Sequence, residues 1–119
     1  MSPEELRRAC LGHTGAREEF PFGPDTSVFK VEGKIFALSS LASPPLRVSL
    51  KCEPALAEQL RGAHPEIVPG YHLNKRHWNT VSVDGLAATM VLDMIEDSYD
   101  LIVCALPKRT WERLGWEPG

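Results

Sequence analysis

The feature that most constrains this fold is a pair of β-rich runs, residues 27–31 and 34–38, separated only by Glu32-Gly33. A two-residue link that ends in glycine is typical of a tight β-hairpin. Residues 46–51 alternate apolar and polar side chains, which predicts a third strand with one buried and one exposed face. A short extended segment is indicated at 67–68 and a further strand at 78–83. We therefore expect a mostly antiparallel sheet.

Three segments have the pattern of helices. Ser2-Pro3-Glu4-Glu5 has the order of a capping box, and predicts a helix that runs to about Leu11. Residues 53–61 indicate a second helix. The longest helical pattern covers residues 86–106 and ends before Pro107. The segment 12–26 contains too many glycines and prolines to continue a helix, and Phe20 and Phe22 are expected to attach this loop to the core.

The order of these elements predicts one α+β domain over residues 1–119, with residues 109–119 as a tail. A chain of 119 residues with 43% hydrophobic and 24% charged side chains can bury a single core. No apolar run approaches the roughly 18 residues that a membrane helix needs, and the first residues lack the pattern of a signal peptide. We expect a cytoplasmic protein with no membrane partner.

Charge is distributed unevenly along the chain. Residues 27–83 carry seven basic and four acidic side chains, a net charge of +3, whereas residues 84–119 carry three basic and seven acidic ones, a net charge of −4. The whole chain has a net charge of −3. Such a total argues against a wholly basic nucleic-acid binder. A sheet formed by the middle segment could nevertheless present one positive face.

A group of segments recurs here in the order typical of a known family. The chain contains Glu19-Phe20-Pro21-Phe22-Gly23-Pro24, the hairpin 28–38, Leu50-Lys51, the run 69–81 (Pro-Gly-Tyr-His-Leu-Asn-Lys-Arg-His-Trp-Asn-Thr-Val), Ser98-Tyr99-Asp100-Leu101 and Leu106-Pro107-Lys108. Through these segments, the sequence resembles the MmcQ/YjbR family of small bacterial proteins. The resemblance covers nearly the whole chain apart from about its last ten residues. It implies a frataxin-like (CyaY-like) α+β fold, a twisted antiparallel sheet packed against helices, and it suggests DNA binding.

The densest group of candidate functional residues lies between positions 71 and 80. Basic side chains that can pair with phosphates alternate there with aromatic side chains that can stack on bases. Basic residues of the predicted hairpin and third strand could extend the same surface, because alternate residues of a strand point to one side. The candidate nucleic-acid contacts are Lys30, Lys34, Arg47, Lys51, Tyr71, Asn74, Lys75, Arg76, His77 and Trp78.

Other interpretations of these residues stay open. Lys75 and Arg76 could be ordinary solvated loop charges while Trp78 fills the core. The chain could also be a protein-interaction module or homodimer, or it could bind a small anionic ligand near residues 71–78. A DNA partner, a protein partner and self-association are therefore all compatible with the sequence.

We expect no enzyme activity, no cofactor and no metal site. The sequence contains no nucleophile elbow, no P-loop and no glycine-rich dinucleotide motif. Its three cysteines lack the close pairs of a metal site, and the four histidines lack a ligand spacing. Ser98 and Tyr99, inside a helical pattern, are interpreted as a packing feature at a helix junction.

Overall fold

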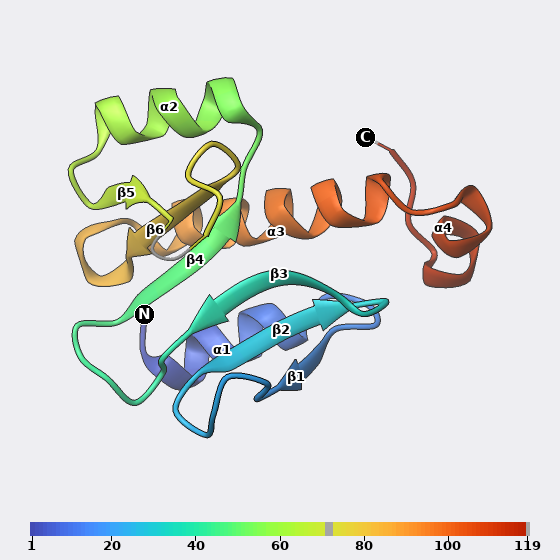
Figure 1. The fold of residues 1–119 in the computed structure, drawn as a ribbon, viewed down its shortest axis with the longest axis horizontal. Coiled ribbons are helices and arrows are strands. Elements are labelled where there is room, and N and C mark those ends of the chain that lie inside the picture. Colours follow the sequence, from blue (N-terminus) through green and yellow to red (C-terminus); the bar gives the residue numbers. More distant parts are fainter. Residues whose placement is uncertain (71–72, 119) are drawn as a thin grey trace.

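An antiparallel sheet forms the body of the protein (Figure 1). The computed structural model describes residues 1–70 and 73–118. In this part of the chain the strands lie in the order β1-β2-β3-β4-β6-β5. Their bounds are Arg17–Glu19, Ser27–Val31, Lys34–Ser39, Arg47–Lys51, Ile67–Pro69 and Trp78–Ser82 for β1 to β6. The mostly antiparallel sheet predicted from the sequence is confirmed.

The predicted hairpin is formed by β2 and β3. Its turn residues, Glu32 and Gly33, both have positive φ angles, 50° and 75°. Two consecutive left-handed residues give the turn a twist that matches the two strands. The pairing is shifted between Phe29 and Lys30, so a bulge brings Phe36 and Ala37 into the same buried layer.

The described residues also form four helices: α1 Pro3–Leu11, α2 Pro54–Ala63, α3 Ala88–Cys104 and α4 Lys108–Leu114, with the short turn η1 at Val83–Gly85. The capping box of α1 is present, because Ser2 and Glu5 each accept a hydrogen bond from the other's backbone N–H. Figure 1 shows α1 and α3 together behind the sheet. The fold is thus a single α+β domain, as the sequence predicted. No helix among the described residues combines the length and the apolar character of a membrane span.

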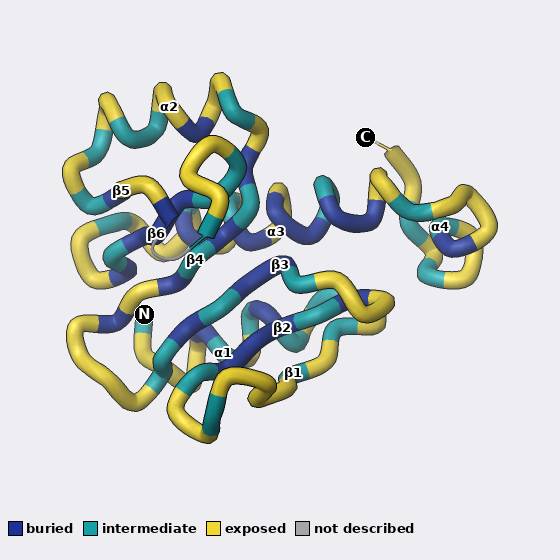
Figure 2. The backbone as a smooth tube through the Cα atoms, viewed as in Figure 1, coloured by how far each residue is buried: buried dark blue, intermediate teal, exposed yellow. Residues whose placement is uncertain are grey.

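The core lies between the sheet and the helices α1 and α3. Phe29, Phe36, Val48, Leu6 and Ile95 are all completely buried there. Figure 2 shows the buried positions running along the central strands and α3, whereas the loops are exposed. This layer fixes which side of each strand faces the helices.

Ser98 and Tyr99 connect α3 to the rest of the core. The Ser98 hydroxyl donates to the Phe36 carbonyl at 2.6 Å and accepts from the Lys51 N–H at 2.9 Å. The Tyr99 hydroxyl donates to the Thr14 carbonyl at 2.7 Å. Both residues lie inside one continuous helix, so the predicted junction is absent at this position but the packing role is present.

Residues 17–22 differ from expectation in two ways. Residues 17–19, predicted as loop, form β1 at the sheet edge, where Arg7 Nε donates to Glu18 Oε1 at 2.7 Å. The prediction that Phe20 and Phe22 attach this region to the core is wrong, since they are 51% and 67% exposed.

The segment expected to be a tail contains α4. The indole N–H of Trp111 donates to the Val103 carbonyl at 2.7 Å, and that of Trp116 donates to Asp100 at 2.8 Å. Trp111, Leu114 and Trp116 pack against the core. These contacts hold residues 108–116 on the end of α3.

Candidate nucleic-acid interface

One face of the sheet carries no α1 or α3, and we call it the open face. On β4, Val48 and Leu50 are buried towards the helices, so Arg47, Ser49 and Lys51 lie on the open face. The register extends this row across the sheet, because Ser49 is opposite Leu38 on β3 and Thr80 on β6. The predicted common face of Arg47, Ser49 and Lys51 is therefore present.

Lys51 and Trp78 are direct cross-strand partners. Trp78 begins β6 and is half-buried. Next to it the chain requires glycine: the Gly70 N–H donates to the Trp78 carbonyl at 2.8 Å, and a Cβ at Gly70 would lie 2.7 Å from the Trp78 Cβ. Trp78 is thus held between Lys51 of β4 and Gly70, which follows β5.

The loop 73–77, between β5 and β6, is held by hydrogen bonds to its backbone. The Asn74 side chain accepts from the Arg76 N–H at 3.0 Å. From α2, the Arg61 guanidinium donates to the Lys75 carbonyl at 3.3 Å and to Asn79 Oδ1 at 2.9 Å. The His77 carbonyl accepts from the Cys52 N–H at 2.8 Å. The backbone of this loop is thus anchored on two sides.

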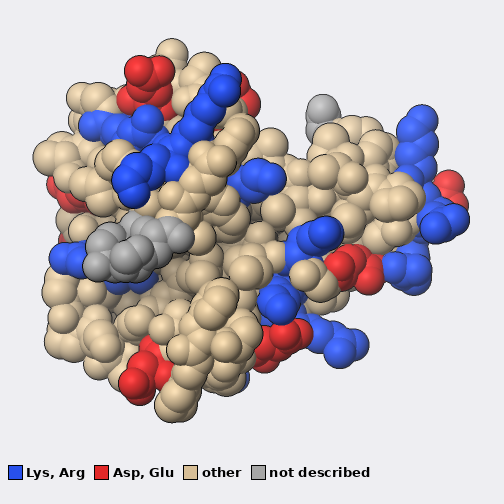
Figure 3. Space-filling view, in the orientation of Figure 1, with Lys and Arg blue, Asp and Glu red and all other residues tan. Residues whose placement is uncertain are grey.

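The side chains of Lys75 and Arg76 are exposed on this anchored loop. Figure 3 shows Lys and Arg side chains gathered over α2 and the β5–β6 loop on the face drawn there. The structure therefore brings together Lys51, Trp78 and the loop 73–77, with Arg47 at the far end of β4. Tyr71 lies outside the described residues.

The two hairpin lysines do not join this group. Lys30 is on the open face, but its Nζ lies 3.1 Å from Glu19 Oε1, which offsets its charge. Lys34 is exposed beside the β2–β3 turn, which Figure 1 places far from the loop 73–77. Arg17 is opposite Lys30. It was missed because its strand, β1, was not predicted. Arg61 was missed because its contacts are long-range.

A hollow of about 620 Å³ lies on the open face. Leu38, Ser49 and Thr80 lie at its floor, and Arg47 also lines it. Its walls come from the loops before β2 and after β3 and from the loop 73–77; they include Phe22, Thr26, Ser43, Pro44, Pro45 and Leu73. Among the described residues, its lining therefore combines apolar walls with hydroxyl groups and the cation Arg47.

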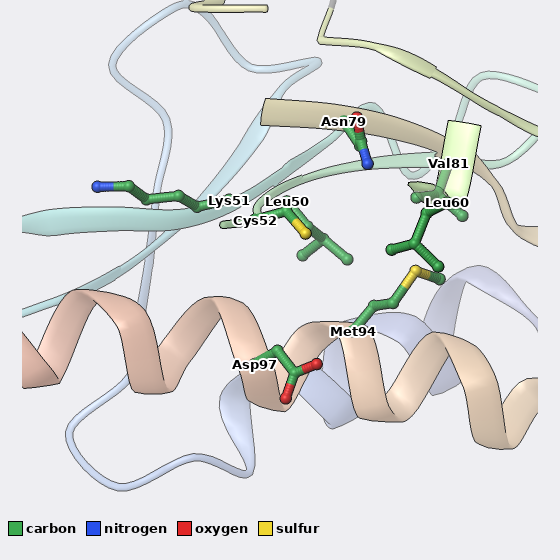
Figure 4. A pocket seen from close by; sticks show the side chains of 8 residues that line it. All are labelled: Leu50, Lys51, Cys52, Leu60, Asn79, Val81, Met94 and Asp97. Carbon is green, nitrogen blue, oxygen red and sulfur yellow. The ribbon is translucent and has the colours of Figure 1, made fainter. Parts of the chain in front are cut away.

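A second, much smaller pocket lies on the other side of the sheet, between α2, α3 and the strands. Figure 4 shows Leu60, Met94 and Asp97 around it, with Lys51 extending away. Its volume is about 20 Å³, room for about one water molecule. Burial, followed by the neighbouring carboxylates of α3, raises the pKa of Asp97. The described residues contain no group of three His, Cys, Asp or Glu side chains arranged to hold a metal ion.

Solved structures of similar proteins have the same fold. The Deinococcus radiodurans protein DR2400, with a DUF419 domain, is 39% identical and superposes with a TM-score of 0.91 over 98% of this chain and 89% of its own. A Pseudomonas syringae protein is 29% identical, with a TM-score of 0.68 over 82% of this chain and 95% of its own.

Proteins of similar sequence include two from Escherichia coli. The uncharacterized protein YbdF of Escherichia coli O157:H7 is 40% identical over 96 residues, 80% of this chain and 79% of the relative. The uncharacterized protein YjbR of Escherichia coli K12 is 36% identical over 109 residues, 91% and 92% of the two chains. The YjbR family profile matches residues 11–101. The resemblance noted in the sequence is confirmed, and the chain belongs to the YjbR family.

Proposed function

We propose that this chain binds nucleic acid through the open face of its sheet, as a binding module without catalytic chemistry. The observation that carries the proposal is the alternation of β4, which puts Arg47 and Lys51 on the face without α1 and α3. The exposed pair Lys75 and Arg76 lies at one end of that face, on a loop with a fixed backbone. Cations held on a rigid frame are suited to phosphate contacts.

The distribution of charge supports this orientation. The acidic residues of α3, Asp93, Glu96, Asp97 and Asp100, belong to the layer on the other side of the sheet. A chain with a net charge of −3 can attract a polyanion only through a local positive surface. The separation of basic strands from an acidic helix provides such a surface and would orient the nucleic acid towards the open face.

The test is fluorescence anisotropy with a labelled duplex and its single strand across a salt series. We expect affinity to fall as salt rises, since phosphate contacts release counterions. Lys75→Ala/Arg76→Ala and Arg47→Ala/Lys51→Ala are each expected to weaken binding and to reduce the salt slope by about 2. Lys108→Ala/Arg109→Ala removes the same charge from exposed residues of α4 and is the matched control.

Two outcomes would contradict the proposal. Absence of binding at low salt for both probes would reject it outright. Equal weakening by the α4 control would show a general charge effect rather than a surface on the sheet.

A further inference from the structure

We propose that the hollow on the open face receives one unstacked base, so that the protein prefers a single strand to a duplex. This inference rests on the proposed function and specifies its ligand. A volume of about 620 Å³ is within the range of about 300 to 1,000 Å³ that small ligands occupy. A nucleotide fits a hollow of that size, whereas a duplex does not enter it.

Phe22 supplies the stacking surface. It lines the hollow and is 67% exposed, although an aromatic ring of this size is normally used to bury apolar area. Aromatic side chains that stack on bases are the common element of single-strand sites, because every base has a π face. Pro44 and Pro45 form an apolar wall with fixed φ angles, and Leu73 closes the hollow from the loop 73–77.

The rim supplies the polar contact. On the floor, the hydroxyls of Ser49 and Thr80 are hydrogen-bonded to each other at 2.9 Å across neighbouring strands. Arg47 lines the same hollow, where its guanidinium can pair with the phosphate of the bound nucleotide. Its backbone carbonyl accepts a hydrogen bond from the Ser39 hydroxyl, which fixes the start of β4.

The shape of the open face favours a single strand for a second reason. Reading a duplex requires an element that projects into a groove, such as a helix or a two-stranded ribbon. At this position the protein offers a concave surface instead, bordered by Arg47 and by the loop that carries Lys75 and Arg76. Unstacked bases of a single strand can enter such a surface, whereas bases inside a duplex are stacked and paired.

The experiment compares two neighbouring phenylalanines by fluorescence anisotropy with labelled oligo-dT. Phe22→Ala should weaken binding about tenfold, the effect of losing one stacked base. Phe20→Ala is the matched control, because Phe20 is also half exposed but does not line the hollow. An abasic oligonucleotide of equal length should bind the wild-type protein about tenfold more weakly than oligo-dT, and Phe22→Ala should not weaken it further.

Oligo-rU of the same length separates RNA from DNA as the source of the strand. The probe that binds more tightly identifies the natural type of strand. The affinity for both oligo-dT and oligo-rU must fall in the Phe22→Ala variant. A duplex of equal length should bind more weakly than oligo-dT at the same salt and be insensitive to Phe22→Ala.

The results distinguish this inference from the proposed function. Equal effects of Phe22→Ala and Phe20→Ala, or tighter binding of the duplex, would overturn the base site while leaving the phosphate surface in place. In that case Lys75→Ala/Arg76→Ala would still weaken the binding of every probe. If no probe binds at low salt, the proposed function itself fails.

Discussion

The two faces of the sheet are made by the same strands but differ in what lies over them. On the face towards α1 and α3, Phe36, Val48 and Ile95 are completely sealed from water. On the open face, the same strands present Arg47, Ser49 and Lys51 beside a hollow. Alternation along a strand thus separates the part of the sequence that stabilises the fold from the part available for binding.

The polar groups on the two sides differ in the same way. Among the described residues, no buried side-chain nitrogen or oxygen lacks a hydrogen-bond partner. Ser98 uses both its donor and its acceptor inside the core, whereas Lys75 and Arg76 are exposed and are anchored through their backbone. We call the face towards α1 and α3 the closed face. A side chain of the closed face is therefore expected to affect stability, and one of the open face to affect binding.

The largest expected difference is in the free energy of unfolding, between a variant of a buried phenylalanine and a variant of an exposed one. Phe36→Ala removes a fully buried ring and should lower the free energy of unfolding by about 3 to 5 kcal/mol. Phe22→Ala removes an exposed ring and should change it by no more than about 0.5 kcal/mol. Urea denaturation of both variants measures the difference. A loss of several kcal/mol for Phe22→Ala would show that this ring supports the fold and would remove it from the candidate binding site.

A smaller loss is expected where α3 bridges two strands. Ser98→Ala leaves the Phe36 carbonyl and the Lys51 N–H without their partner, at a cost of about 1 to 3 kcal/mol. Thr89→Ala, an exposed position of the same helix, serves as the control and should stay within about 0.5 kcal/mol of wild type. The measurement is again urea denaturation. If the two variants are equally stable, the Ser98 bridge contributes nothing beyond filling space.

Local patterns were enough to predict most of the sheet. The turn at Glu32-Gly33 and the alternation of 46–51 depend on neighbours in the sequence, and both appear in the structure as expected. The common face of Arg47 and Lys51 follows directly from that alternation. These features were predictable because period and turn chemistry act over a few residues.

The features that were missed depend on distant residues. β1 consists of Arg17, Glu18 and Glu19, which have no strand pattern, and it pairs with β2 while Glu18 accepts from Arg7. Phe22 was expected to be buried because it is apolar, yet exposed apolar residues are common in folded proteins. The anchoring of the loop 73–77 by Arg61 depends on an approach of α2 that no local pattern indicates.

The smallest expected effect is a dependence of stability on pH that arises on the closed face. His13 stacks on Tyr99 with ring centroids 4.7 Å apart, and burial lowers the pKa of His13 from 6.5 although Glu96 and Asp100 act in the opposite direction. With a folded pKa below the unfolded one, the unfolded chain binds more protons between the two values. Stability should therefore be complete above about pH 6.5 and fall as the pH drops towards the folded pKa of His13.

Urea denaturation of wild type and His13→Gln between pH 7.5 and about pH 5.5 measures this slope. The variant should be less stable at every pH, because it loses the ring contact, but it should lose less stability on acidification. An unchanged slope in His13→Gln would assign the pH dependence to other groups and would show that protonating His13 leaves the closed face intact.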